Sequence, residues 1–154
     1  MPAPSRVDPR GPRVAAALTT AVLALVLLTG SGWLLVAQAA VFALGALDRS
    51  PYGWAFRRAV RPFLSPPAEL EDARPPRFAQ LVGLVFALLA LAGVAAGSSV
   101  LAVAATAAAL TAAFLNATFG VCLGCEAYLL LQRSPFRRTR QPSASTPTPT
   151  EVFR

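Results

Sequence analysis

The chain has 154 residues, of which 55% are hydrophobic and 14% are charged, and its mean hydropathy is +0.56. This balance excludes an ordinary soluble domain of this size, in which about a quarter of the residues are charged. The net charge is +7, and all 14 basic residues are arginines, because the chain has no lysine and no histidine. Membrane topology and anionic lipid head groups account for this charge, so nucleic acid is not expected as a partner.

The first two apolar blocks cover residues 14–29 and 33–47, and an uncharged Gly30-Ser31-Gly32 turn separates them. A membrane span needs roughly 20 apolar residues, with about 17 tolerated, so both blocks are short spans that together predict a helical hairpin. Residues 1–13 carry three arginines and resemble the start of a signal peptide. Cleavage is not expected, because a second apolar block follows at once instead of a polar mature domain.

The central segment, residues 48–77, combines six arginines with four carboxylates and six prolines, which exclude one long helix. Its aromatic residues alternate with arginines, which favours a short amphipathic turn at the membrane interface. Apolar blocks at residues 78–96 and 98–121 then predict a second hairpin. We expect the last helix to extend to residue 132, and the Ser/Thr/Pro-rich residues 139–154 to form a disordered tail.

The arginines lie in three groups: before the first hairpin, between the hairpins, and after the second hairpin. Both hairpin turns lack them. Because positively charged residues favour the cytoplasmic side of a membrane, all three groups are expected in the cytoplasm. The sequence therefore predicts an all-α, four-span transmembrane helix bundle over residues 14–138, built from two helical hairpins. We expect it in the bacterial inner membrane, with the lipid bilayer as partner and both termini cytoplasmic.

The two hairpins resemble a parallel internal repeat. Residues 8–15 before the first hairpin match residues 72–79 before the second at the aspartate, both arginines, the second proline and an alanine. The hairpins also end alike, at residues 49–52 and 133–136. Since each unit begins on the same side, the repeat axis would lie along the membrane normal. In this register residues 119–131 are an insertion in the second unit; a chance match of flanking segments is the alternative.

The chain's two cysteines, Cys122 and Cys125, lie in this insertion. They could close a small disulfide, supply half of a metal site, or pack as small residues. Positions i and i+3 share a helical face, and the glycine between them lets the backbone bend toward disulfide geometry. Cys122 would ionise more readily at a helix N-terminus, which requires a new helix after Gly120. Glu126 would disfavour the thiolate but could relay its proton, and Asn116 is the other strongly polar group nearby.

Metal binding has less support, because one cysteine pair offers two ligands and tetrahedral zinc or an iron–sulfur cluster wants four. With no histidine available, no metal and no other cofactor is expected. Small residues at helical spacing, including Gly120 and Gly124, favour instead a tight helix seam in which both thiols merely pack. The chain shows no catalytic triad, P-loop or dinucleotide fingerprint, so a classical hydrolase or transferase is not expected.

Residues 8–13, 71–80 and 116–128 together resemble the DUF4395 family, which comprises small bacterial membrane proteins without an assigned function. The last of these segments is the most specific, because its asparagine, glycine, two cysteines, glutamate and tyrosine all match. The resemblance covers about residues 5 to 138 of the chain. Genes of this family often lie near those of thioredoxin-like or sulfurtransferase proteins, which implies, by association, a thiol partner of one of these kinds.

The preferred hypothesis is therefore a thiol-redox or sulfur-handling membrane partner. Its site residues are Cys122 as the attacking thiolate, Cys125 as the resolving thiol, Glu126 as proton relay and Asn116 as local support. A structural or assembly subunit whose cysteines only pack is the alternative from another class. A small transporter is a further alternative, but transport needs a water-accessible polar lining, and the spans offer little beyond Gln38, Gln80 and Asn116. The sequence leaves the oligomeric state open, a homo-oligomer included.

Overall fold

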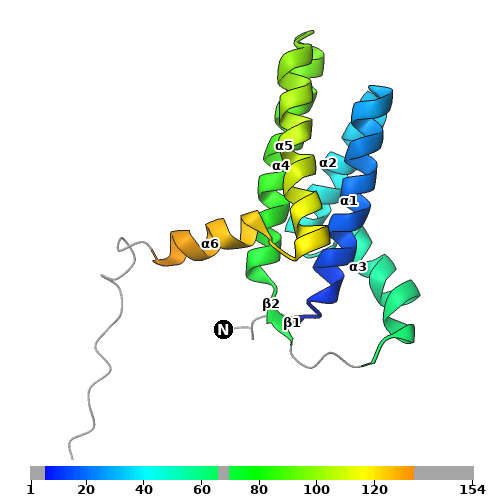
Figure 1. Cartoon of the computed structure of the whole chain (residues 1–154), viewed down its shortest axis with the longest axis vertical. Coiled ribbons are helices and arrows are strands. Elements are labelled where there is room, and N and C mark those ends of the chain that lie inside the picture. Colours follow the sequence, from blue (N-terminus) through cyan, green and yellow to red (C-terminus); the bar gives the residue numbers. More distant parts are fainter. Residues whose placement is uncertain (1–5, 66–69, 134–154) are drawn as a thin grey trace, which may run out of the picture.

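The computed structural model describes residues 6–65 and 70–133 and is all-α apart from one pair of two-residue strands. The expected disordered tail, residues 139–154, lies outside the described residues. Two antiparallel helical hairpins stand side by side, and a shorter helix projects from them (Figure 1). The hairpin helices are α1 (Arg10–Thr29), α2 (Gly32–Ala46), α4 (Arg74–Ala95) and α5 (Ser99–Phe119).

Three of these helices, α1, α4 and α5, are long and apolar enough to cross a membrane. Helix α2 has 15 residues, which at 1.5 Å per residue gives about 22 Å, short of the roughly 30 Å hydrocarbon core. A fourth span results if α2 is counted with the helical segment Pro51–Phe63, to which it is bent by 77°. The described residues thus indicate a membrane protein with three or four spans.

The four long helices close a ring in the order α1, α2, α4, α5, with contacts between each neighbouring pair and between α5 and α1. Leucine, valine and phenylalanine from α1 and α2 meet alanines from α4 and α5 in the core. In lipid, small residues allow such close helix packing. Near the turn between α4 and α5, a Cβ added at Gly93 would lie 2.6 Å from the Ala102 backbone nitrogen, so this position requires glycine.

Both hairpins turn in the same way. Gly30 and Gly97 adopt left-handed backbone conformations, with φ of 66° and 68°. The serine that follows each glycine caps the next helix, since Ser31 accepts from the Leu34 N–H and Ser98 from the Leu101 N–H. These local signals explain why the sequence locates the turns correctly.

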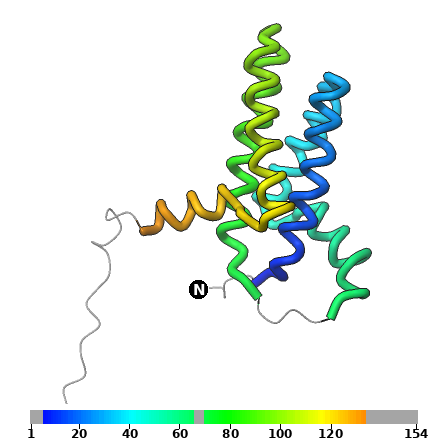
Figure 2. The backbone as a smooth tube through the Cα atoms, viewed as in Figure 1, coloured from blue at the N-terminus to red at the C-terminus, as the bar shows by residue number. Residues whose placement is uncertain are grey.

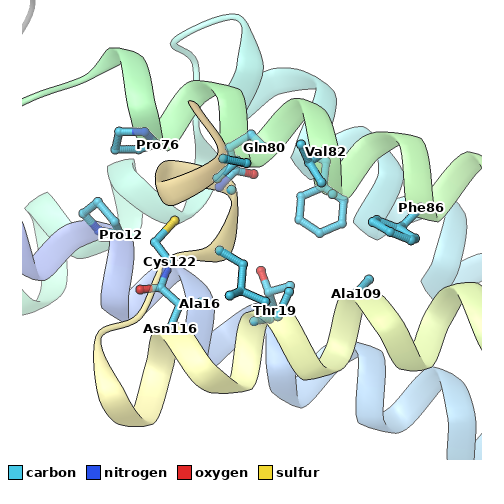
Figure 3. A pocket seen from close by; sticks show the side chains of 18 of the residues that line it. Pro12, Ala16, Thr19, Pro76, Gln80, Val82, Phe86, Ala109, Asn116 and Cys122 are labelled. Atoms are coloured by element: carbon cyan, nitrogen blue, oxygen red, sulfur yellow. The ribbon is translucent and has the colours of Figure 1, made fainter. Parts of the chain in front are cut away.

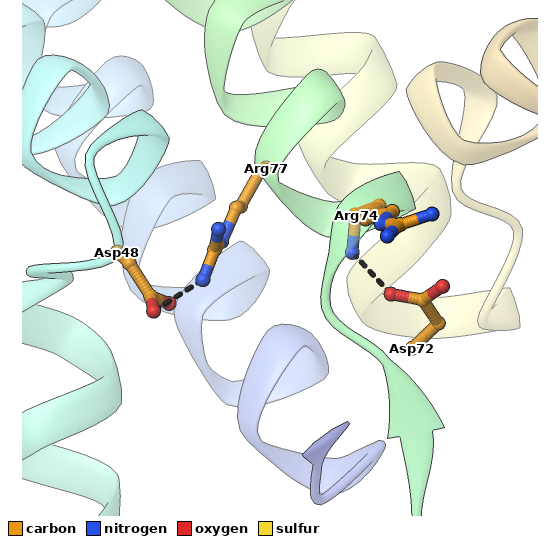
Figure 4. Close-up of polar contacts among 4 residues, drawn as sticks. All are labelled: Asp48, Asp72, Arg74 and Arg77. Atoms are coloured by element: carbon orange, nitrogen blue, oxygen red, sulfur yellow. Dashed lines mark hydrogen bonds and ion pairs between the residues drawn. The ribbon is translucent and has the colours of Figure 1, made fainter. Parts of the chain in front are cut away.

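The segments that precede the two hairpins are also alike. Strand β1 (Arg6–Val7) pairs antiparallel with β2 (Glu71–Asp72). The Asp8 carboxylate accepts the backbone N–H of Arg10 at 3.0 Å, and the Asp72 carboxylate accepts that of Arg74 at 2.9 Å (Figure 4). A two-fold axis that exchanges the hairpins would map the α1–α5 contact onto the α4–α2 contact, and both contacts exist. The arrangement supports the internal repeat.

The structure gives a different register at the ends of the hairpins. After α2, Asp48 has a φ of 65° and Ser50 caps α3 (Pro51–Ala55), which continues as a π-helical turn (Phe56–Val60) and a 3-10 turn (Arg61–Phe63). After α5, Gly120 has a φ of 71° and Cys122 precedes α6 (Leu123–Arg133). The extension expected as far as residue 132 is therefore a separate helix, and it corresponds to α3 and its two turns rather than to an insertion.

Helix α6 leaves the bundle sideways near the end at which α1 and α4 begin, here called the arginine-rich end (Figure 2). Gly124 places α6 directly on α4, because a Cβ at this glycine would lie 2.6 Å from the Ala79 Cα. The rings of Phe78 and Tyr128 add a contact with centroids 5.6 Å apart. The predicted G-x-x-x-G seam is thus split: Gly120 ends one helix, and Gly124 packs the next one against α4.

Candidate thiol site and its cavity

Cys122 and Cys125 form a disulfide at the start of α6, and their Cα atoms are 5.1 Å apart. This separation lies within the usual range of about 4.4–6.8 Å for disulfides. Within residues 6–65 and 70–133, no cluster of three or more cysteine or carboxylate side chains could hold a metal ion.

Cys122 occupies the N-cap position of α6. Its Sγ accepts the backbone N–H of Cys125 at 3.3 Å, and its carbonyl oxygen accepts that of Glu126 at 2.9 Å. The new helix that thiolate stabilisation requires does begin after Gly120. The N–H groups and dipole of a helix N-terminus favour negative charge, so the reduced Cys122 sulfur lies where a thiolate is stabilised.

Arg13 brings a positive charge to this site, although its place in the sequence predicts only a role in membrane topology. Its Nη2 donates to the Thr118 carbonyl oxygen at 3.5 Å, at the C-terminal end of α5. A Cβ added at Gly120 would lie 3.7 Å from the guanidinium carbon of Arg13. The positive charge is therefore close to the loop that leads into Cys122. Only the packing of α1 against α5 reveals this, since Arg13 and Cys122 are 109 positions apart in the sequence.

A cavity of about 370 Å³ opens beside Cys122, between α1, α4, α5 and α6. Its lining consists of alanine, glycine, proline and larger apolar residues, with the polar groups of Asn116, Gln80 and Thr19 among them. Cys122 and Asn116 both line the end of the cavity near the loop between α5 and α6 (Figure 3). The volume is in the range of small-ligand sites, about 300–1,000 Å³, and the lining favours an apolar group.

The structure brings together part of the predicted site. Cys122 and Asn116 share the cavity, and Cys125 is half-buried and bonded to Cys122. Glu126 is exposed on α6 and does not line the cavity. Its carboxylate therefore faces the surroundings of the helix rather than the space beside Cys122.

The two glutamines of the hairpins hold helices together. Gln38 is 1% exposed; its Nε2 donates to the Thr19 hydroxyl at 3.4 Å, and its Oε1 accepts from the Tyr52 hydroxyl at 2.9 Å. Gln80 packs on Gly45 of α2, where an added Cβ would lie 2.9 Å from the glutamine side chain. Hydrogen bonds between helices, such as those of Gln38, are a usual role of polar groups in membrane proteins.

The fold and the site together define a small helical membrane protein with a disulfide at the start of a short helix, bordering a mostly apolar cavity. The family DUF4395, described as a domain of unknown function, matches residues 7–133, and the chain belongs to this family. This confirms the resemblance drawn from its motifs. The comparisons with curated proteins and with solved structures give no match.

Proposed function

We propose that this protein exchanges its Cys122–Cys125 disulfide with the thiols of a partner protein, as a thiol-redox or sulfur-handling component of the membrane. The observation that carries the proposal is the pairing of the chain's two cysteines at a helix N-terminus that borders a cavity. A packing role alone would not require a disulfide. A transport role would require a polar pathway, and the polar groups of the cavity lining are few.

The exchange proceeds in two balanced steps. A thiolate of a reduced dithiol partner attacks the Cys122 sulfur, forms a mixed disulfide, and releases Cys125 as a thiolate. The second thiol of the partner, after losing its proton, then attacks the sulfur that the first one contributed to the mixed disulfide, and Cys122 leaves as a thiolate. The partner loses two electrons, and the cysteine pair gains them and takes up two protons. In the reverse direction Cys122 attacks and Cys125 resolves.

Cys122 is assigned the attacking role because the α6 N-terminus and the nearby Arg13 both favour its thiolate. Asn116 lines the same cavity and supports the reacting sulfur from α5. Glu126 follows Cys125 directly and is exposed, so it relays the proton of the resolving thiol to water and not into the cavity.

Sulfur transfer is the second form of the same chemistry, and the cavity favours it. In the reduced protein, the Cys122 thiolate would attack the outer sulfur of a persulfide on a sulfurtransferase, whose own cysteine leaves as a thiolate. The resulting Cys122 persulfide would place its outer sulfur in the space beside Asn116. Attack of the Cys125 thiolate on the inner sulfur would restore the disulfide and release hydrosulfide, so sulfide release distinguishes this reaction from protein thiol exchange.

The proposed setting is the bacterial inner membrane, with the arginine-rich end and both termini in the cytoplasm. The cytosol is reducing, so the disulfide there is an intermediate of exchange and not a permanent crosslink. A thioredoxin-like or sulfurtransferase protein is the proposed partner. Cysteines introduced at Ser31 and Ser98 should react with an impermeant maleimide from the periplasmic side; labelling from the cytoplasm would overturn this orientation.

Thiol trapping tests the function. In Cys125→Ala the mixed disulfide at Cys122 has no resolving thiol, so a partner should remain crosslinked to the protein in cells. Cys122→Ala is the matched control and should trap much less. Two results together would establish the structural role instead. Cys125→Ala would form no mixed disulfide, and a Cys122→Ser/Cys125→Ser variant would fully replace the wild-type protein in a deletion strain.

A further inference from the structure

A second cavity, of about 270 Å³, lies at the arginine-rich end between α1, α2, α3 and α4. The internal repeat relates it to the first cavity, the one beside Cys122, which is called the thiol cavity below. Ser50 lines it where Cys122 lines the first cavity, and the two residues cap their helices alike. The repeat-related prolines Pro12 and Pro76 line both cavities, as does Gln80. The two cavities are therefore adjacent, and repeat-related helices form them.

The lining of this second cavity is strongly charged, unlike that of the first. Its charged groups are Arg6, Arg57, Arg61, Arg77, Asp8 and Asp48. Four guanidinium groups against two carboxylates leave a net charge of +2. Arg77 pairs with Asp48 (Figure 4), and Asp8 accepts the backbone N–H of Arg10. Beyond the Arg77–Asp48 pair, the charged groups of the lining are three arginines, Arg6, Arg57 and Arg61, and the Asp8 carboxylate, which leaves the net charge of +2.

These three arginines converge from two parts of the chain. Arg6 lies on β1, and Arg57 and Arg61 lie one helical turn apart in the segment after α3. The Nη1 atom of Arg57 lies 3.7 Å from a Cβ added at Gly53, so this side chain extends back over the start of α3. Guanidinium groups bind oxyanions through paired N–H donors, which makes such a cluster suited to phosphate.

We infer that this second cavity binds a phosphate group or a similar oxyanion at the arginine-rich end, next to the thiol cavity. The binding depends on Arg57 and Arg61 and does not use the cysteines. The phosphate can belong to an anionic lipid head group or to a soluble anion, and both present the same chemistry to the guanidinium groups.

The test uses the full chain in nanodiscs. In discs of neutral phosphatidylcholine, inorganic phosphate is added and its binding is measured by ³¹P NMR line broadening. In parallel, discs that contain phosphatidylglycerol are analysed by native mass spectrometry for retained anionic lipid. Binding in the first arm identifies a soluble anion as a ligand, and retention in the second arm alone identifies a lipid head group.

The decisive variant is Arg57→Gln/Arg61→Gln, and Arg49→Gln/Arg58→Gln is the control because it removes the same charge outside the cavity. Each lost guanidinium should weaken binding roughly tenfold, since a hydrogen bond to a charged group is lost. Circular dichroism checks that the variants fold. Equal weakening in both variants, or no binding in either arm, would overturn the inference. Cys122→Ser/Cys125→Ser should bind normally, which separates this test from that of the proposed function.

Discussion

The position of the disulfide depends on Gly124, and a single methyl group at this residue should displace it. In Gly124→Ala the new Cβ would lie 2.6 Å from the Ala79 Cα and 2.7 Å from its Cβ. Ordinary van der Waals contact begins at about 3.4 Å, so α6 must retreat from α4 by about 0.8 Å. Because the contact includes the α4 backbone, a rotation of one side chain cannot relieve it.

Two consequences of this displacement can be measured. Overpacking of this kind costs about 1–3 kcal/mol of stability, which should lower the unfolding midpoint in detergent. A displacement near 1 Å at a reacting group can reduce its rate by up to about a hundredfold, so reduction of the disulfide by a dithiol protein should slow markedly. Reduction is followed by alkylation of the freed thiols with a mass-adding maleimide.

Gly32→Ala is the matched control, because a Cβ at this glycine at the start of α2 meets nothing within 4 Å. It should leave both the unfolding midpoint and the reduction rate unchanged. Ala79→Gly should rescue Gly124→Ala only in part, since it removes the contact with the Ala79 Cβ but not the one with the Cα. Wild-type stability and a wild-type reduction rate in Gly124→Ala would refute the packing of α6 on α4.

Two further perturbations probe the electrostatics and the polar core. Arg13→Gln removes the cation near Cys122, so alkylation of the reduced protein should reach half its maximal rate at a higher pH than in the wild type. Arg58→Gln is the control and should not shift this pH profile. Equal profiles for the wild type and both variants would exclude a role for Arg13. Gln38→Leu breaks a buried hydrogen-bonded chain and should cost about 1 kcal/mol in thermal unfolding, whereas Gln132→Leu, at an exposed position, should cost nothing measurable.

The hairpins are predictable from the sequence because their signals are local. Uncharged blocks specify the long helices, and a left-handed glycine followed by a capping serine marks each turn. The expected apolar block, residues 33–47, and α2 (Gly32–Ala46) have the same length and differ by one residue at each end. The sequence does not predict how the chain leaves α2, because it turns at Asp48, a non-glycine residue with positive φ.

The break after α5 shows why the site could be predicted only in part. A glycine in an apolar stretch suits both a close-packed seam and a left-handed helix end, and the sequence alone does not choose. In the structure the packing of Gly124 against Ala79 favours the break at Gly120, since a straight helix would not bring these residues together. The placement of Arg13 follows from the same tertiary contacts. Both features are non-local.

The correspondence of Ser50 with Cys122 leads to a final prediction about the repeat. Ser50 Oγ accepts the backbone N–H of Gly53 at 3.1 Å, just as Cys122 Sγ accepts that of Cys125 at 3.3 Å. A Cβ added at Gly53 would lie 3.4 Å from the Ser50 Cβ, close to the roughly 3.5–4.5 Å that disulfides span. The first unit therefore has the backbone of a thiol site without its sulfur atoms.

Ser50→Cys/Gly53→Cys should accordingly form a second disulfide, in the charged cavity. Under oxidising conditions that close the Cys122–Cys125 pair, the variant should take up no maleimide, and after reduction it should take up four. The substitutions leave Arg57 and Arg61 in place, so oxyanion binding tests whether the cavity keeps its shape. If the two new thiols stay fully reactive while the native pair is closed, the capping turns are not equivalent and the repeat does not extend into α3 and α6. If the two new thiols form a disulfide, the two cavities differ in their side chains alone. The same backbone conformation then holds a thiol pair in one unit and an arginine cluster in the other.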